Sequence, residues 1–359
     1  MSRTASRAAR PRRSGRVALA VAALLLAACA GDASAPAPSP APASTPDAPE
    51  APDAPDPVLV VATTSILGDL VASVVGEEGT VRVLMAPGVD PHGYAASASD
   101  AAALRDADLV VANGLRLEEG LLAALDAAAA DGVRVLEVAP LLDPIPFAAG
   151  PHDHDDDEHD HGDDEHDHDD DEHDEHDHGE LDPHFWFDPI RAATAGELVA
   201  DALVALGSDG DWAARAAGLR AELEALDAEL TATFAAVPEA RRRLVTNHDS
   251  LGYLADRYGF EIIATVVPGS STSVATNPAA FADLADLLVA EGVDVVFAET
   301  TDSDTLARAL ADEAVGRGGL EIEVVTLFTG SLGPAGSGAE TYAGMLRTDA
   351  ALISAALLG

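Results

Sequence analysis

Three histidines stand apart from the other nine and carry the clearest chemistry of the chain. His92 and His184 each follow an Asp-Pro pair, and His248 ends the β-rich run RLVTN. Neutral imidazole is the commonest metal ligand, and a nearby carboxylate commonly orients the ring. A single histidine of this kind would more often be structural, but three of them favour a shared site. Because the chain has one cysteine, a cysteine-based zinc site is excluded, and three imidazoles with one oxygen suit tetrahedral zinc.

The other nine histidines lie in one segment, residues 151–178, with seventeen acidic residues and no apolar residue. Such a composition cannot bury a core, so we expect a disordered, solvated loop over 151–180. Its imidazoles could bind zinc weakly at several places and would release it below about pH 6, when they protonate. Three roles of this loop stay open: capture of metal for the main site, sensing of high metal, and solvation alone. The auxiliary ligands would be His152, His154, His159, His161, His166, His168, His173, His176 and His178.

Short β-rich runs alternate with helical patterns on both sides of that segment. The first series starts with VLVVATT at position 58, and the second starts with RLVTN at position 243. This alternation predicts mostly parallel sheets with helices on both faces. We therefore predict an α/β fold of two lobes, an N-terminal lobe over 58–207 and a C-terminal lobe over 239–359. Because the three histidines fall in both lobes, a metal site that they share would lie between the lobes.

A long helical pattern within residues 208–238 separates the two series. It runs from Trp212 to about Val237, just before Pro238. About 26 residues at 1.5 Å each would span roughly 39 Å, so we predict one long rigid helix that joins the lobes. A coiled-coil seam is disfavoured, since the repeat stops after about three heptads. The larger apolar residues form one stripe: Trp212, Leu219, Leu223, Leu226, Leu230, Phe234 and Val237.

The N-terminus has the composition of an export signal over residues 1–28. Six arginines without an acid precede a continuous apolar run of twelve residues. A helix of twelve residues spans roughly 18 Å, too short for a bilayer core of about 30 Å. The sequence LAAC ending at Cys29 resembles the lipobox of bacterial lipoproteins, which implies lipidation of Cys29 and a surface anchor. Residues 29–57 are rich in Ala and Pro and would form a tether.

Composition excludes several classes of function. The chain has 20 basic and 63 acidic residues and a formal net charge of −43, which argues against a nucleic-acid partner. All of its basic residues are arginine, so lysine Schiff-base chemistry and a Walker-type phosphate site are excluded. A cluster of three of them, Arg241 to Arg243, could form a docking patch, although a solvated run at a helix end is the favoured interpretation.

With these motifs in view, the chain resembles the metal-binding solute-binding proteins of bacterial zinc and manganese ABC importers, in particular the zinc-preferring branch. The resemblance covers residues 58 to 359 and rests on DPHGY, DPHFWFDP, TNHDSLGYLADRYGF, VVPGSSTS, VVFAET and TGSLGPAGSGAETYAGML. It implies a monomer that delivers metal to a membrane permease, with little hinge motion. His92 and His184 would be ligands from the N-terminal lobe, and His248 from the C-terminal lobe. A histidine in the third place favours Zn²⁺ over Mn²⁺.

The resemblance fails at the fourth ligand. Many members have Asp where this chain has Gly330, and glycine cannot coordinate through a side chain. The oxygen could come from Glu299 at the end of the VVFAE run, from water, or from Asp249 or Asp302. Glu299 is the favoured protein ligand, and its pairing with an arginine such as Arg257 is the alternative.

We expect a non-enzymatic receptor that captures Zn²⁺ outside the membrane and hands it to the permease of an ABC importer. A zinc hydrolase or hydratase is the main rival, because three histidines and an open fourth position can also activate water. A stand-alone extracellular metal buffer or a protein of cell adhesion is the second rival. Turnover of an ester or of CO₂ would favour the enzyme, and neighbouring genes for a permease and an ATPase would favour the importer.

Overall fold

The computed structural model describes residues 57–147, 181–267, 278–318 and 321–359. Four predictions fall outside these ranges, apart from residue 57. They are the signal peptide over 1–28, the lipidation of Cys29, the tether over 29–57 and the His/acid-rich loop over 151–180. No helix in the described ranges is long and apolar enough to cross a membrane.

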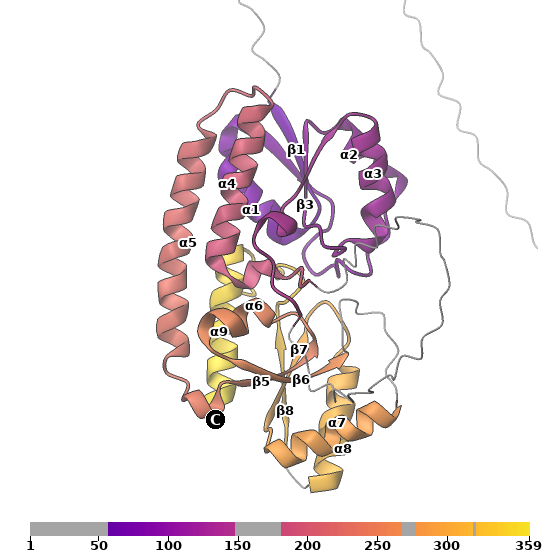
Figure 1. Ribbon diagram of the computed structural model, residues 1–359, viewed down its shortest axis with the longest axis vertical. Helices are drawn as coiled ribbons and strands as arrows, with labels where there is room; N and C mark the ends of the chain where they lie inside the picture. The colour runs from indigo at the N-terminus through magenta and orange to yellow at the C-terminus, as the bar shows by residue number, and fades with distance from the viewer. Residues whose placement is uncertain (1–56, 148–180, 268–277, 319–320) are drawn as a thin grey trace, which may run out of the picture. The chain divides into compact units, whose positions relative to one another are not determined.

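The first half of the chain forms a parallel sheet of four strands in the order β2-β1-β3-β4. The two central strands are almost wholly buried and consist of Val, Leu and Ala, as expected for a sheet covered on both faces. Figure 1 shows α1 and α4 on one side of this sheet and α2 and α3 on the other. The strands are β1 (Val58–Ala62), β2 (Gly79–Val83), β3 (Leu109–Ala112) and β4 (Arg134–Glu137).

The second half forms another four-stranded parallel sheet, in the order β6-β5-β7-β8. The two sheets therefore repeat one topology, in which the strand that comes first in the chain pairs on both sides. The strands are β5 (Arg243–His248), β6 (Glu261–Val267), β7 (Val295–Glu299) and β8 (Glu323–Leu327). The predicted α/β class with two mostly parallel sheets is confirmed.

Helices follow most strands, and side-chain caps fix several of their first residues. Thr64, Ser97, Asp188 and Thr341 each accept a backbone N–H from the first turn of the helix that follows. The α-helices besides α5 are α1 (Ser65–Val75), α2 (Ala98–Asp106), α3 (Leu122–Ala130), α4 (Pro189–Ala205), α6 (Gly252–Tyr258), α7 (Pro278–Glu291), α8 (Thr305–Gly318) and α9 (Tyr342–Leu358).

One helix begins later than its sequence pattern indicates. The pattern LEEGLLAALDAAAA extends from 117 to 130, but α3 begins at Leu122 after a short 3-10 turn. Glu118 is buried and accepts the backbone N–H groups of Asn113 and Gly114, so its side chain holds a loop together. Glu118 itself has φ −94° and ψ 60°, which is outside the helical region, so the helix cannot run through it.

The long helix α5 (Trp212–Phe234) has 23 residues and ends three residues earlier than predicted. Every residue of the predicted apolar stripe is buried, including Val237 in the turn that follows. The helix packs against α1 and α4 beside the first sheet and against α9 beside the second. The stripe is confirmed, and the role of α5 as a rigid link between lobes stays a prediction.

The largest hydrophobic core is continuous between the two sheets. It has about fifty buried residues, which include Val60 of β1, Trp186, Leu226 of α5 and Phe297 of β7. Two smaller cores lie under α7 and α8 and under α2 and α3. Movement of one sheet relative to the other would have to break the shared apolar packing, which resists separation of the two halves.

Candidate metal centre

The three predicted histidines come together from three separate segments. His92 lies in the loop after β2, His184 directly precedes the 3-10 turn Phe185–Phe187, and His248 is the last residue of β5. Loops at the carboxyl ends of parallel strands are where such sheets present ligand-binding groups. The side chains are well buried, with 8%, 1% and 2% of each residue exposed. His92 and His184 thus meet although they are 92 positions apart in the sequence.

The ring nitrogens converge to the spacing that one metal ion requires. Nε2 of His184 lies 3.2 Å from Nε2 of His92 and 3.3 Å from Nε2 of His248. The three ligating atoms all lie within 4.8 Å of one another. Two nitrogens bonded to the same tetrahedral zinc at about 2.0–2.1 Å would be about 3.3 Å apart. The arrangement can therefore accept a divalent cation with little movement of the rings.

The imidazoles are held in the neutral form that binds metal. Burial lowers the pKa of His184 to about 3. Burial, and then repulsion from His184, lowers the pKa of His92 to about 3, and the same causes hold the pKa of His248 well below its ordinary value. Protons therefore do not compete for these nitrogens at neutral pH.

The two Asp-Pro-His turns use their carboxylates differently. Asp182 Oδ1 accepts the backbone N–H of His184 at 2.9 Å and lies 2.7 Å from its Nδ1. Burial raises the pKa of Asp182 well above its ordinary value, and the neutral ring of His184 carries one proton. A cation at Nε2 favours placing that proton on Nδ1, which leaves Nε2 free to coordinate. The predicted orienting carboxylate is thus present at His184.

At His92 the expectation of a carboxylate on the ring was wrong. Asp90 Oδ1 accepts the backbone N–H of His92 and Oδ2 that of Gly93, so this side chain shapes the turn. Nδ1 of His92 and Nδ1 of His248 are buried and have no hydrogen-bond partner among the described residues. Hydrogen bonding at Nδ1 therefore fixes the orientation of His184 more firmly than that of the other two rings.

The family of this chain is shown by its similarity to known proteins. The profile of one family, described as ZnuA, zinc-uptake complex component A, periplasmic, matches residues 60–356. The chain belongs to the ZnuA family. This confirms the resemblance inferred from the motifs, and it confirms that the protein is not an enzyme, because the family is one of uptake components.

Relatives within the ZnuA family are named for more than one metal. The zinc-binding protein TroA of Treponema pallidum is 28% identical over 303 residues, which cover 83% of this chain and 88% of TroA. The high-affinity zinc uptake protein ZnuA of Paracoccus denitrificans is 32% identical over 295 residues, 80% of this chain and 86% of ZnuA. The manganese-binding lipoprotein MntA of Bacillus subtilis is 29% identical over 302 residues, 83% of this chain and 89% of MntA.

A solved structure supports the ZnuA-family fold directly. The periplasmic zinc-binding protein TroA of T. pallidum matches this structure with a TM-score of 0.68 at 29% identity, covering 84% of this chain and 99% of TroA. The two-lobe α/β architecture is therefore shared with an experimentally determined relative.

In this ZnuA-family chain, residues that the sequence analysis did not single out hold the histidine segments in place. Asn113 Nδ2 donates to the carbonyl of Pro183, next to His184, at 3.0 Å. Trp186 Nε1 donates to the carbonyl of Thr329 at 2.8 Å, and its ring meets that of His184 edge-on at 5.2 Å. The DPHFWFDP motif contained the signal for Trp186, but the pattern alone indicates only aromatic bulk.

Glu299 is outside the cluster of three histidines. It ends β7, is 5% exposed, and its Oε1 accepts the hydroxyl of Ser250 at 2.9 Å. The alternative pairing with Arg257 was wrong, because that arginine forms ion pairs with Asp188 and Asp227. Among the other carboxylates considered, Asp302 accepts Nδ2 of Asn247, and Asp249 is buried beside His248.

The carboxyl of Glu299 should make folding depend on pH. Burial raises its pKa from 4.5 to about 7, above its unfolded value, so folding favours the protonated form. The stabilisation is fully present below about pH 4.5 and is lost as the pH rises through about 7. At about 1.4 kcal/mol per pKa unit, the loss approaches roughly 3 kcal/mol. Glu299→Gln, which mimics the neutral acid, should therefore stabilise the protein much more at about pH 8 than at about pH 4.

Denaturant unfolding of the metal-free wild type and of Glu299→Gln at both pH values measures this difference in free energy of unfolding. A difference that is the same at both pH values would show that folding does not raise the pKa of Glu299.

Proposed function

We propose that this protein is the extracytoplasmic receptor of an ABC importer, which captures Zn²⁺ and delivers it to the membrane permease. The observation that carries the proposal is the convergence of three buried, neutral Nε2 atoms at 3.2 and 3.3 Å. Membership of a family of periplasmic zinc-uptake components supports delivery to an importer. Zn²⁺ is then the cargo of the protein and not a resident cofactor.

The ligand types support zinc over manganese. Imidazole suits Zn²⁺, whereas Mn²⁺ takes sites rich in carboxylate, carbonyl and water oxygens. Relatives of similar identity are named for zinc and for manganese, so the names do not decide between the metals. We propose Zn²⁺ as the cargo and expect Mn²⁺ to bind more weakly, because three nitrogens face the site.

The proposed ligands are His92, His184 and His248, with one oxygen in the fourth place. We propose that water supplies this oxygen, since Glu299 is engaged with Ser250 and lies outside the cluster. A Cβ atom at Gly330 would lie 3.3 Å from Pro91 and 3.2 Å from the hydroxyl of Thr301. Position 330 therefore adjoins the turn that holds His92, and it is closely packed.

Zinc titration of Glu299→Gln separates the two sources of the oxygen. An unchanged affinity supports water, whereas a loss of tenfold or more would support Glu299 as the ligand.

The attachment to the membrane also belongs to this proposal. The LAAC pattern ending at Cys29 supports lipidation, and the MntA relative is named as a lipoprotein. We propose that the signal peptide over 1–28 is removed, that lipidated Cys29 anchors the chain, and that residues 29–57 form the tether. The His/acid-rich loop would bind zinc weakly. We propose a monomer with lobes over 58–207 and 239–359, joined through residues 208–238.

Growth under zinc limitation tests the function. Cells that lack the gene should grow poorly when a chelator depletes zinc, and the full-length chain should restore growth. A chain with all three site histidines replaced by alanine should not restore it, although its loop is intact. Cys29→Ala should restore growth only in part, because the receptor would no longer stay at the membrane. Normal growth of the deleted strain would instead favour a stand-alone metal buffer.

A further inference from the structure

Helix α6 (Gly252–Tyr258) begins four residues after His248 and contacts the segment that carries His184. Its side chains at positions 253 and 257 are one turn apart, so they lie on the same face of the helix. These two side chains reach the two ends of the His184 turn, which we define as residues 182–188. The helix therefore connects two of the three histidines through a short path.

Tyr253 holds the first end of the His184 turn. Its hydroxyl donates to the carbonyl of Asp182 at 2.9 Å and accepts the backbone N–H of Ile145 at 3.3 Å. The guanidinium of Arg191 lies 5.0 Å from the centre of the same ring, a favourable cation–π distance. Asp182 is the residue whose carboxylate orients the ring of His184, so Tyr253 fixes the backbone from which that contact is made.

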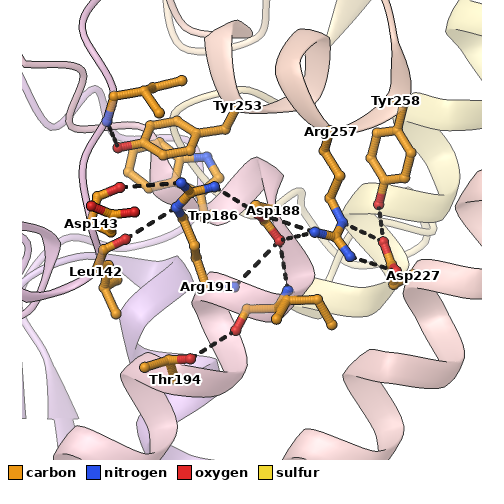
Figure 2. Close-up of polar contacts among 12 residues, drawn as sticks. Leu142, Asp143, Trp186, Asp188, Arg191, Thr194, Asp227, Tyr253, Arg257 and Tyr258 are labelled. Atoms are coloured by element: carbon orange, nitrogen blue, oxygen red, sulfur yellow. Dashed lines mark hydrogen bonds and ion pairs between the residues drawn. The ribbon is translucent and has the colours of Figure 1, made fainter.

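Arg257 holds the other end. Its guanidinium binds Asp227 of α5 through two hydrogen bonds of 2.5 and 2.6 Å, and its Nη1 lies 3.2 Å from Asp188. Figure 2 shows this line of contacts running from Asp227 through Arg257 and Asp188 to Arg191. Asp188 also caps the first turn of α4. Arg257 therefore joins α5, α6 and the end of the His184 turn.

Arg191 closes the network on the far side. It bonds Asp188 through Nη1 at 2.8 Å, and it donates to the carbonyls of Leu142 and Asp143 at 3.1 Å each (Figure 2). Asp188 is 3% exposed, and charge-assisted hydrogen bonds are about twice as strong as neutral ones. A buried carboxylate between two arginines has one favourable position, so the end of the turn is rigidly placed.

From these contacts we propose that Tyr253 and Arg257 are positioning residues, which clamp the two ends of the His184 turn and so set the separation of His184 and His248 for metal binding. The proposal rests on the proposed function, since it concerns the affinity of the same centre. It assigns to α6 a positioning role, because the Tyr253 hydroxyl bonds the carbonyl of Asp182 and the Arg257 guanidinium is paired with Asp227 and Asp188.

Arg220 provides a matched control. It forms a similar two-pronged ion pair with Glu197 and joins α5 to α4, and its side chain is 28% exposed compared with 25% for Arg257. Among the residues that the structure describes, its hydrogen-bond partners are Glu197 and Thr194, which both belong to α4 and lie outside the His184 turn. Arg220→Gln therefore removes a pair of the same kind without touching the clamp.

Zinc affinity of the full chain, measured by competition with a chromophoric chelator, tests the proposal together with the absorption spectrum of bound Co²⁺. We expect Arg257→Gln to weaken the tightest zinc site roughly tenfold, as for other residues that orient metal ligands, and to shift the Co²⁺ bands. Tyr253→Phe, which keeps the ring and removes one hydroxyl, should act in the same direction. Arg220→Gln should leave affinity within about twofold and the spectrum unchanged. Equal effects of Arg257→Gln and Arg220→Gln would overturn the proposal.

A measurement on the metal-free protein distinguishes failure of the clamp hypothesis from failure of the proposed zinc-binding function. In the metal-free protein, Arg257→Gln and Tyr253→Phe should shift the NMR signals of the His184 and His248 rings, and Arg220→Gln should not. Failure of the wild type to bind zinc tightly would refute the proposed function while these shifts still supported the clamp. Unshifted ring signals in both clamp variants would refute the clamp even if zinc bound tightly.

Discussion

Replacing His184 by alanine is expected to abolish tight zinc binding. Its Nε2 lies between those of His92 and His248, at 3.2 and 3.3 Å, so its loss removes the central ligand. Binding free energies of structural zinc sites are about 10–16 kcal/mol in total, which corresponds to roughly 3 kcal/mol or more for each ligand. We therefore expect the affinity to fall on the order of 100-fold or more.

The measurement is a zinc titration of the chain from residue 58 with the segment 152–178 deleted, so that the auxiliary histidines cannot mask the result. The unaltered centre in this background should bind one equivalent tightly, and His92→Ala and His248→Ala should lose it as well. Asp182→Asn is the graded comparison, because loss of the orienting carboxylate typically costs 10–100-fold. Tight binding that survives His184→Ala would place the zinc site elsewhere in the chain.

Trp186→Ala is expected to cause the largest loss of stability around the centre. The indole is 2% exposed within the shared core, and its Nε1 donates to Thr329. The backbone carbonyl of Trp186 accepts the hydroxyl of Tyr342 at 2.7 Å. Truncation of a buried aromatic side chain costs about 3–5 kcal/mol, and here it also removes the ring that packs on His184. Zinc affinity of the folded variant should therefore fall too.

Trp212→Ala separates the two effects. Trp212 is equally buried at the start of α5 and its Nε1 donates to the carbonyl of Ser208, outside the three segments that carry the histidines. Denaturant unfolding should show a comparable loss of stability in both variants. Only Trp186→Ala should weaken zinc binding under conditions in which the protein is folded. An unaffected affinity in Trp186→Ala would show that His184 is positioned without the indole.

Most of the elements could be predicted from the sequence because their patterns are local. Buried Val-rich strands such as β1 and β7 are continuous apolar runs, and the stripe of α5 follows the helical period. The start of α3 could not be predicted, since a side chain, Glu118, competes for the backbone of residues 113 and 114. Such side-chain bonds to the backbone depend on burial, which the pattern does not contain.

The contacts of the basic cluster after α5, residues 241–243, could not be predicted from the sequence pattern either. Arg241 pairs with Asp294, Arg243 pairs with Glu291, and Arg242 donates to the carbonyls of Val237 and Tyr258. These partners come from other segments, so the run that resembled a docking patch is tied into its own lobe. The favoured interpretation was a solvated run at a helix end, but all three arginines have partners here.

Residue types and short motifs were enough to show which groups could bind metal. They separated three histidines from nine, excluded cysteine and lysine chemistry, and indicated an α/β fold with motifs specific enough to identify the family. Composition and short motifs are enough here because the ability of a side chain to bind metal depends on its residue type, and a motif depends only on neighbouring residues.

The geometry of the centre, in contrast, depends on the tertiary fold. Folding brought one ligating nitrogen of each histidine to within 4.8 Å of the others. It gave the ring of His184 an orienting carboxylate and the ring of His92 none. It also joined Glu299 to Ser250 and placed α6 against both ends of the His184 turn. Most of these contacts join segments that are distant in sequence. Their distances are set by the packing of the shared core, which no local pattern encodes.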